Sequence, residues 1–111
     1  MASTLTTPLY YVNDKPHIGS VYTTLAVDTL ARFKRLSGEQ VMFITGCDEH
    51  GQKIQRTAES AGIEPQQHCD EISSTFASTW SQWQISNDRF IRTTDPRHQS
   101  IVEEFFARVE A

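Results

Sequence analysis

The feature that most constrains the fold is a nearly continuous apolar run at residues 41–45, Val-Met-Phe-Ile-Thr, which lies between segments of helical periodicity. A strand that is apolar on both faces is typical of the centre of a parallel sheet, because helices cover both faces there. Residues 5–12 alternate threonines with apolar residues, which predicts an earlier strand. This strand is followed by a predicted turn at residues 13–16, Asn-Asp-Lys-Pro. Residues 89–92 predict a short third strand.

Helical segments are predicted between these strands. From Val21 onward, apolar residues recur three or four positions apart and share one helix face: Tyr22, Ala26, Leu30 and Phe33. Residues 37–38, Ser-Gly, end this helix. A second helix covers residues 52–61, and Pro65 begins a third that runs to about residue 83.

The last predicted helix begins at Asp95 and Pro96, a pair typical of an N-cap followed by the first helical residue, and it runs to the C-terminus. The resulting order is strand, helix, strand, two helices, strand, helix. This alternation predicts a Rossmann-like α/β fold, in which the chain forms the first half of a parallel nucleotide-binding sheet with flanking helices.

The composition limits the kind of protein. With 111 residues, 38% of them hydrophobic and 22% charged, the chain is expected to form one globular domain. The formal net charge is −4, and no basic run forms a nucleic-acid-binding surface. No membrane partner is expected, because no apolar stretch has the length of a membrane span. Two cysteines, Cys47 and Cys69, are too few for a disulfide framework, which favours a cytoplasmic protein.

Two loops are expected to form a ligand site, because ligands of open α/β sheets bind at the carboxyl ends of the strands. The loop at residues 13–20 places His17 and Gly19 before a helix N-terminus, whose free N–H groups suit a phosphate. His17 can donate a hydrogen bond to a phosphate oxygen, and Gly19 has no Cβ to keep a flat base away. The loop at residues 46–51 contributes Asp48, a carboxylate that can bind an ammonium group.

Each of these residues also has an ordinary structural interpretation. His17 in a turn is otherwise a solvated or helix-capping histidine, and Gly19 a turn glycine. Asp48 and Glu49 are otherwise residues that cap the next helix, where acidic side chains are favoured.

Metal binding is not expected, because structural zinc sites pair cysteines two to four residues apart, and neither residues 47–50 nor residues 68–69 supply such a pair. Trp80 and Trp83, three apart on a helix, are expected to form a packing face.

Two long stretches carry a resemblance to a known family. Residues 7–19, Thr-Pro-Leu-Tyr-Tyr-Val-Asn-Asp-Lys-Pro-His-Ile-Gly, and residues 45–51, Thr-Gly-Cys-Asp-Glu-His-Gly, resemble the start of the catalytic domain of methionyl-tRNA synthetases. These are class I aminoacyl-tRNA synthetases, and residues 17–20, His-Ile-Gly-Ser, are similar to the His-x-Gly-His motif of that class. The resemblance covers essentially the whole chain, including residues 22–24 and 90–94.

The resemblance implies a reaction whose substrates are methionine and the Mg²⁺ complex of ATP. They give methionyl-adenylate and pyrophosphate, and the methionyl group then passes to tRNA. It implies that Leu9 and Tyr11 line the pocket for the methionine side chain. It also implies that Asp48 holds the ammonium group of methionine.

For ATP, the resemblance implies that His17 contacts the phosphates and that Gly19 lies under the adenine. Asn13 is assigned to ATP because it lies in the same loop. Ser20 stands where the motif has its second histidine. A hydroxyl can donate to a phosphate but carries no positive charge, so His17 is expected to have the larger role in catalysis.

The family also has parts that these 111 residues do not contain. They are the Lys-Met-Ser-Lys-Ser loop, the zinc-bearing connective insertion and the anticodon-binding domain. The expectation is therefore an N-terminal segment, residues 1–111, that needs the remainder of the catalytic domain, holds no zinc, and reaches tRNA only through downstream domains. Two alternatives are an inactive truncated fragment and another nucleotidyltransferase with a His-x-Gly-His loop.

Overall fold

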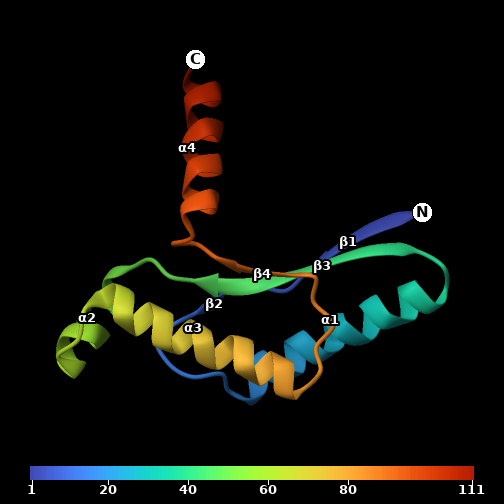
Figure 1. Ribbon diagram of the computed structural model, residues 1–111, viewed down its shortest axis with the longest axis horizontal. Coiled ribbons are helices and arrows are strands. Elements are labelled where there is room, and N and C mark those ends of the chain that lie inside the picture. Colours follow the sequence, from blue (N-terminus) through green and yellow to red (C-terminus); the bar gives the residue numbers. More distant parts are fainter.

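The computed structural model describes all 111 residues as eight elements (Figure 1). In chain order they are β1 (Ala2–Thr6), β2 (Tyr10–Tyr11), α1 (Ile18–Leu36), β3 (Gln40–Asp48), α2 (Gln52–Ala61), α3 (Pro65–Gln82), β4 (Arg89–Arg92) and α4 (Pro96–Glu110). The predicted alternation of strands and helices is confirmed. The predicted helix ends are also close, since Pro65 is the first residue of α3 and the Asp95 side chain caps α4 by accepting a hydrogen bond from the Arg97 N–H.

The strands form one parallel sheet with β3 at its centre. Strand β1 pairs with residues 40–44 of β3, β2 with residues 47–48 and β4 with residues 44–47, all in parallel. The carbonyl of Ile44 accepts from the N–H of Thr7, while the carbonyl of the preceding residue, Phe43, accepts from the N–H of Asp88. Carbonyls of successive strand residues point in opposite directions, so β1 and β4 lie on opposite sides of β3.

The predicted single strand at residues 5–12 is wrong in its bounds. The sheet begins earlier, at Ala2, and it is interrupted between Thr6 and Tyr10. Pro8 lies in the interruption, and proline has no N–H to contribute to a ladder. Four residue steps from Thr6 to Tyr10 face three steps from their partners Ile44 to Cys47, so the first strand carries one extra residue, as a β-bulge does.

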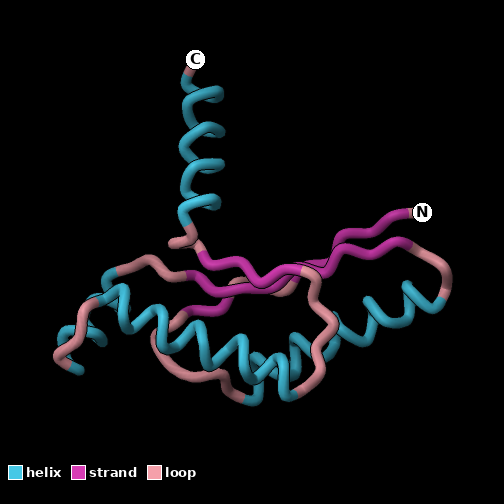
Figure 2. The backbone as a smooth tube through the Cα atoms, viewed as in Figure 1, coloured by secondary structure: helices cyan, strands magenta, loops and turns pink.

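Helices α1, α2 and α3 lie on one side of the sheet (Figures 1 and 2). This follows from the topology, because both crossovers step across the sheet in the same direction and right-handed crossovers then place their helices on the same face. The main core lies between these helices and the sheet. It consists of seven buried side chains: Val12, Val21, Cys47, Ile54, Cys69, Phe76 and Trp80. Tyr10 extends this core by stacking on Phe76, with the ring centroids 5.7 Å apart.

Two predicted packing faces differ from the structure. The predicted face of α1 lies at the surface, since Tyr22 is 77% exposed and Phe33 is 65% exposed. The helix instead buries a largely polar stripe that comprises Ser20, Val21, Thr24, Asp28 and Ala31. The expected tryptophan pair is also divided, since Trp80 is buried whereas Trp83 is 52% exposed at the end of α3.

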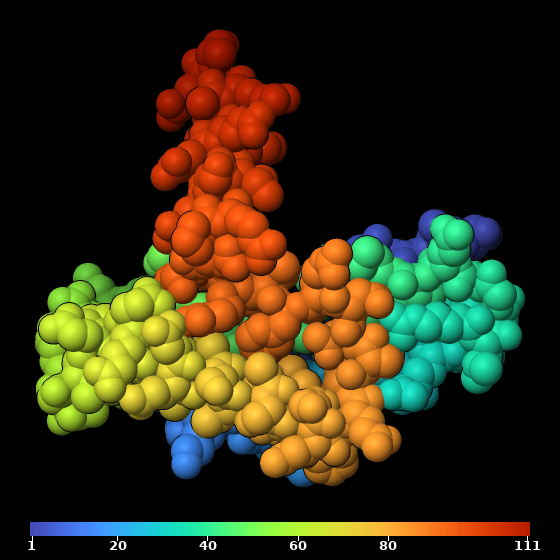
Figure 3. Space-filling view, viewed as in Figure 1, coloured from blue at the N-terminus to red at the C-terminus, as the bar shows by residue number.

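Helix α4 stands away from the sheet and buries none of its residues (Figures 1 and 3). As a result the radius of gyration is 15.9 Å, against about 13 Å for a compact domain of this length. None of the four helices combines the length and apolar character that a membrane-spanning segment requires.

Candidate functional site

The two predicted loops meet at the carboxyl ends of β2 and β3. Tyr10 pairs with Cys47 in the sheet, and both side chains belong to the core beneath the helices. The next pair is Tyr11 and Asp48. Since successive side chains of a strand point to opposite faces, Tyr11 and Asp48 project together from the face that α1, α2 and α3 do not cover.

Asp48 is a strand residue and not a loop residue, which corrects the predicted end of this strand at residue 45. Strand β3 continues to Asp48 because residues 46–48 still pair with β2 and β4. The Asp48 side chain is partly exposed. Its carboxylate takes part in none of the hydrogen bonds and ion pairs of the chain, whereas the neighbouring Glu49 is fully engaged. A free carboxylate on an open sheet face can bind a cation.

His17 caps helix α1, which begins at Ile18 rather than near Val21. The Nδ1 atom of His17 accepts a hydrogen bond from the Gly19 N–H at 3.0 Å. The structural interpretation of His17 as a helix cap is therefore correct. It does not exclude binding, because a neutral imidazole that accepts at Nδ1 carries its proton at Nε2. This second nitrogen has no partner in the chain, and His17 is exposed.

Gly19 is required by the position of the His17 ring. A Cβ on Gly19 would lie 2.8 Å from His17 Cε1 and 3.0 Å from Nδ1. Any larger residue would therefore push the imidazole away from the first turn of α1. The absence of a side chain at Gly19 therefore leaves room for the His17 ring, in addition to any space that it leaves for a base.

Ser20 completes the cap from the third helical position. Its Oγ accepts a hydrogen bond from the His17 N–H at 3.4 Å. Only 5% of Ser20 is exposed, and its carbonyl accepts hydrogen bonds from Thr24 Oγ1 at 2.8 Å and from the Tyr10 hydroxyl at 3.3 Å. The serine thus ties the His17 backbone to the helix and to the sheet.

Two adjoining cavities join the predicted residues. One, of about 400 Å³, is lined by five of the seven predicted site residues, namely Leu9, Tyr11, Asn13, His17 and Ser20. The other, of about 340 Å³, lies toward the loop after β3 and includes His50 and Gly51. Tyr11 and Asn13 line both cavities, so the surface is continuous between the two loops. Asp48 and Gly19 line neither cavity, although Asp48 lies beside Tyr11.

An ion-pair cluster beside Asp48 was not predicted from the sequence. The Glu49 side chain is fully buried, and Arg92 donates to both of its oxygens, at 2.8 and 2.7 Å. Arg92 also contacts Asp70. The hydrogen bonds that Arg92 donates, first to Glu49 and then to Asp70, raise the pKa of Arg92, and the hydrogen bond from Arg92 lowers the pKa of Asp70. Neither Asp48 nor Glu49 caps the next helix, since the N-cap of α2 is Gly51.

The histidines and cysteines near the site have packing roles. His68 is buried and donates from Nε2 to the Val12 carbonyl at 2.8 Å. Burial raises the pKa of the Cys47 thiol to about 12 and also raises the pKa of Cys69, so both thiols stay protonated at neutral pH. A metal would need the thiolate form. No three histidine, cysteine or acidic side chains are grouped as a metal site would require.

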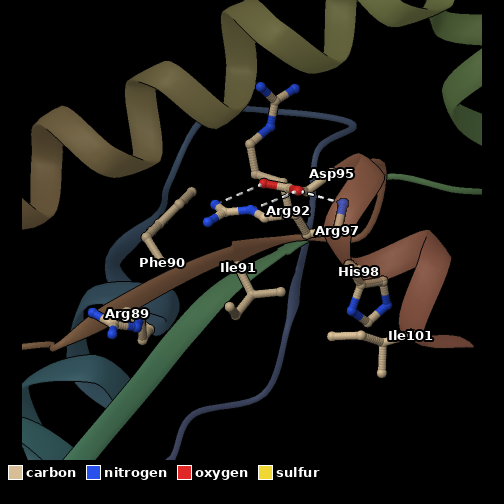
Figure 4. A pocket seen from close by; sticks show the side chains of 8 residues that line it. All are labelled: Arg89, Phe90, Ile91, Arg92, Asp95, Arg97, His98 and Ile101. Atoms are coloured by element: carbon tan, nitrogen blue, oxygen red, sulfur yellow. Dashed lines mark hydrogen bonds and ion pairs between the residues drawn. The ribbon is translucent and has the colours of Figure 1, made fainter.

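A further cavity of about 290 Å³ lies at the junction of β4 and α4 (Figure 4). It is lined by Arg89, Phe90, Ile91, Arg92, Asp95, Arg97, His98 and Ile101. Two of its three arginines already face acidic partners, because Arg92 binds Glu49 and Arg97 lies 3.5 Å from Asp95. This cavity contains none of the predicted site residues.

Comparison with known proteins connects this geometry to a family. The family model described as "tRNA synthetases class I (M)" matches residues 3–111. The chain is 67% identical over 105 residues to the methionine–tRNA ligase of Thermosynechococcus vestitus, and the aligned region covers 95% of this chain and 20% of that protein. It is 58% identical over 107 residues to the chloroplastic/mitochondrial methionine–tRNA ligase of Arabidopsis thaliana, with 96% of this chain and 17% of that protein covered.

A solved structure gives the same result. The chain superposes on Mycobacterium tuberculosis methionyl-tRNA synthetase in complex with methionyl-adenylate with a TM-score of 0.95 at 39% identity. The match covers 98% of this chain and 21% of the other. The chain thus spans about a fifth of the length of the relatives that it matches. The family match and the superposition confirm the Rossmann-like fold and the resemblance, and the chain belongs to the methionyl-tRNA synthetase family of class I tRNA synthetases.

Proposed function

We propose that this chain, residues 1–111, is the first half of the catalytic domain of a methionine–tRNA ligase and binds methionine and ATP to form methionyl-adenylate. The observation that carries the proposal is the pairing of Tyr11 with Asp48, which sets a free carboxylate on an open sheet face beside the cavity that contains His17. A cationic group and a phosphate can therefore bind a short distance apart, as the amino group and the phosphate of an aminoacyl-adenylate require.

Methionine binds at Asp48, Leu9 and Tyr11 in this proposal. The Asp48 carboxylate pairs with the ammonium group. Leu9 and Tyr11, which are 42% and 63% exposed, provide apolar surface for the methionine side chain. These two residues form only part of a pocket, and one methylene is worth about 1–3 kcal/mol of discrimination even in a complete pocket. Selectivity against leucine therefore depends on residues outside this chain.

ATP, bound as its Mg²⁺ complex, lies over the N-terminus of α1. The free N–H groups of the first helical turn favour a phosphate there. His17 Nε2–H donates to a phosphate oxygen as negative charge develops, Ser20 supports the His17 backbone, and Asn13 contributes from the shared wall of the two cavities. The adenine lies against Gly19, which presents no side chain.

The chemistry needs no nucleophile from the protein. The methionine carboxylate attacks the α-phosphorus of ATP, a P–O bond forms, and the bond to the pyrophosphate leaving group breaks. The contribution of the chain is to hold the two substrates in line and to stabilise charge at the α-phosphate.

Transfer to tRNA, in this proposal, uses segments beyond these 111 residues, and the chain holds no zinc of its own. A cytoplasmic location is proposed because both cysteines are free thiols in the core, which suits a reducing compartment.

The test replaces the matching residues of the Thermosynechococcus vestitus ligase with this chain and measures methionine-dependent ATP–pyrophosphate exchange by the chimera. Asp48→Asn is expected to raise the KM for methionine about 30- to 1000-fold, because losing one partner of a close charge pair costs about 2–4 kcal/mol. The KM for ATP should stay nearly constant.

The control is Glu71→Gln, the same kind of change at an exposed position of α3, which should leave both KM values unchanged. An inactive chimera without substitutions would contradict the proposed function. An equal rise in both KM values with Asp48→Asn would remove the assignment of Asp48 to the ammonium group.

A further inference from the structure

We infer that Thr93, together with the Arg92–Glu49 ion pair, positions Asp48 for the amino group of the substrate. This inference rests on the proposed function and adds to it three positioning residues: Glu49 directly after β3, Arg92 in β4 and Thr93 in the turn after β4. None of the three is expected to contact methionine or ATP.

Thr93 binds the backbone on both sides of Asp48. The Thr93 N–H donates to the Cys47 carbonyl at 3.3 Å, which belongs to the peptide group before Asp48. The Glu49 N–H, in the peptide group after Asp48, donates to Thr93 Oγ1 at 2.8 Å. Because both flanking peptide groups are hydrogen-bonded to Thr93, the orientation of the Asp48 Cα–Cβ bond depends on this residue.

Asp48 and Glu49 are two adjacent acidic residues, and only one of them faces the open side of the sheet. Neighbouring residues of an extended chain point to opposite sides, so one of Asp48 and Glu49 must face inward. Arg92 holds Glu49 there with two hydrogen bonds, and Thr94 Oγ1 adds a third at 3.2 Å. A buried carboxylate is stable only when it is paired in this way. With Glu49 fixed inside, Asp48 faces the open side of the sheet and is the only one of the two that presents its charge there.

Thr93 also holds the side chain of His50, the residue that follows Glu49. The Thr93 carbonyl lies 3.3 Å from His50 Nε2, which can donate to it. Thr93 is only 9% exposed, so its three contacts are made away from solvent. Thr93, in the turn after β4, therefore holds Cys47 before the proposed ammonium site and Glu49 and His50 after it.

The experiment uses the chimera described above with Thr93→Val, Thr93→Ser, Asp48→Asn and the double variant Asp48→Asn/Thr93→Val. Valine keeps the shape of threonine and removes the acceptor for the Glu49 N–H, whereas serine retains it. Thr93→Val is expected to raise the KM for methionine about 10-fold, the scale on which supporting residues act. The KM for ATP should not change, and Thr93→Ser should restore the original value.

The double variant separates positioning from general stability. If Thr93 acts through Asp48, then Thr93→Val has no further effect on the KM for methionine once Asp48 is Asn. The same 10-fold rise in that background, or equal rises for methionine and ATP, would overturn the inference and leave the proposed function intact. If Asp48→Asn alone has no effect on methionine, the assignment of Asp48 fails and this inference fails with it.

Folding is checked by thermal melting of each variant. Should Thr93→Val fail to fold, Glu49→Gln takes its place, because glutamine keeps the size of the side chain and weakens the Arg92 clamp. It carries the same expectation, a rise in the KM for methionine alone that disappears in the Asp48→Asn background. The absence of that rise would overturn the inference.

Discussion

A Cβ atom on Gly46 would lie only 2.0 Å from the carbonyl oxygen of Ile91. The two residues are register partners in β3 and β4, so the backbone of β4 occupies the space that a side chain would need. Gly46 lies two residues before Asp48, and β4 leads directly into Thr93. The close approach of these strands is therefore what allows Thr93 to reach the backbone on both sides of Asp48.

Gly46→Ala is expected to destabilise the chain by about 3 kcal/mol, because the added methyl group displaces a neighbouring backbone that cannot move like a side chain. The measurement is urea unfolding followed by circular dichroism. Gly38→Ala serves as the control, since a Cβ there meets no atom and only the positive φ of 85° opposes it. That change should cost about 1 kcal/mol. Equal losses for the two variants would contradict the close approach.

His17 is expected to be the Nε2–H tautomer, because its Nδ1 accepts the Gly19 N–H. The ¹⁵N chemical shifts of the ring nitrogens report this at pH 8.5, where an ordinary imidazole is neutral. Gly19→Ala should shift the ring nitrogens toward mixed-tautomer values as the methyl group displaces the ring. His68, which donates to Val12 from Nε2, should not change and is the internal reference. An unaltered His17 spectrum in Gly19→Ala would be evidence against the cap.

Asp28 is expected to make stability depend on pH in the acid range. Burial raises the pKa of Asp28, but hydrogen bonds from Ser86 and Arg32 lower it by more, so the net pKa lies below the ordinary value of 3.8. A carboxyl with a depressed pKa in the folded state stabilises above its unfolded pKa, and this contribution is lost as the pH falls through the folded value.

Asp28→Asn should therefore reduce the free energy of unfolding by about 2 kcal/mol at pH 7, the value of hydrogen bonds to a charged group. The difference from the parent chain should shrink by pH 3. Urea unfolding at both pH values provides the measurement, and a gap that stays constant would show that the charge of Asp28 is not involved.

The isolated chain is expected to self-associate through its uncovered apolar surface. Helix α4 exposes five large apolar residues: Ile101, Val102, Phe105, Phe106 and Val109. A patch of this kind is unusual on a monomer. Sedimentation velocity should show a weight-average mass that rises with concentration, and Phe105→Glu with Phe106→Glu should reduce that rise. A single monomeric species at all concentrations would contradict this prediction.

The sequence predicts much of the fold because the strands and helices differ in the period of their apolar residues. It does not predict which face of α1 is covered. The buried stripe contains Thr24 and Asp28, whose polar groups are satisfied by Ser20 and Ser86, whereas the more apolar Tyr22 and Phe33 face outward. Periodicity identifies a face, but the partner that covers it is decided by tertiary contacts.

Within the site, the residues with a recognisable chemistry are easier to predict than the residues that support them. His17 and Asp48 belong to short motifs with a recognisable chemistry. The Glu49–Arg92 pair joins residues that are 43 positions apart, and only the register of β3 and β4 brings them together. The bulge at Pro8 was missed for a similar reason, because the extra residue becomes visible only when β1 and β2 are aligned on β3.

The most direct test of the site is to map where a non-hydrolysable methionyl-adenylate analogue binds on the ¹⁵N-labelled chain, by amide chemical shifts. We expect the shifts to cluster at residues 9–20 and 46–51, at the carboxyl ends of β2 and β3, and we expect Asp48→Asn to weaken binding of the analogue. Shifts centred on the cavity between β4 and α4, or none in these two loops at saturating analogue, would contradict this expectation.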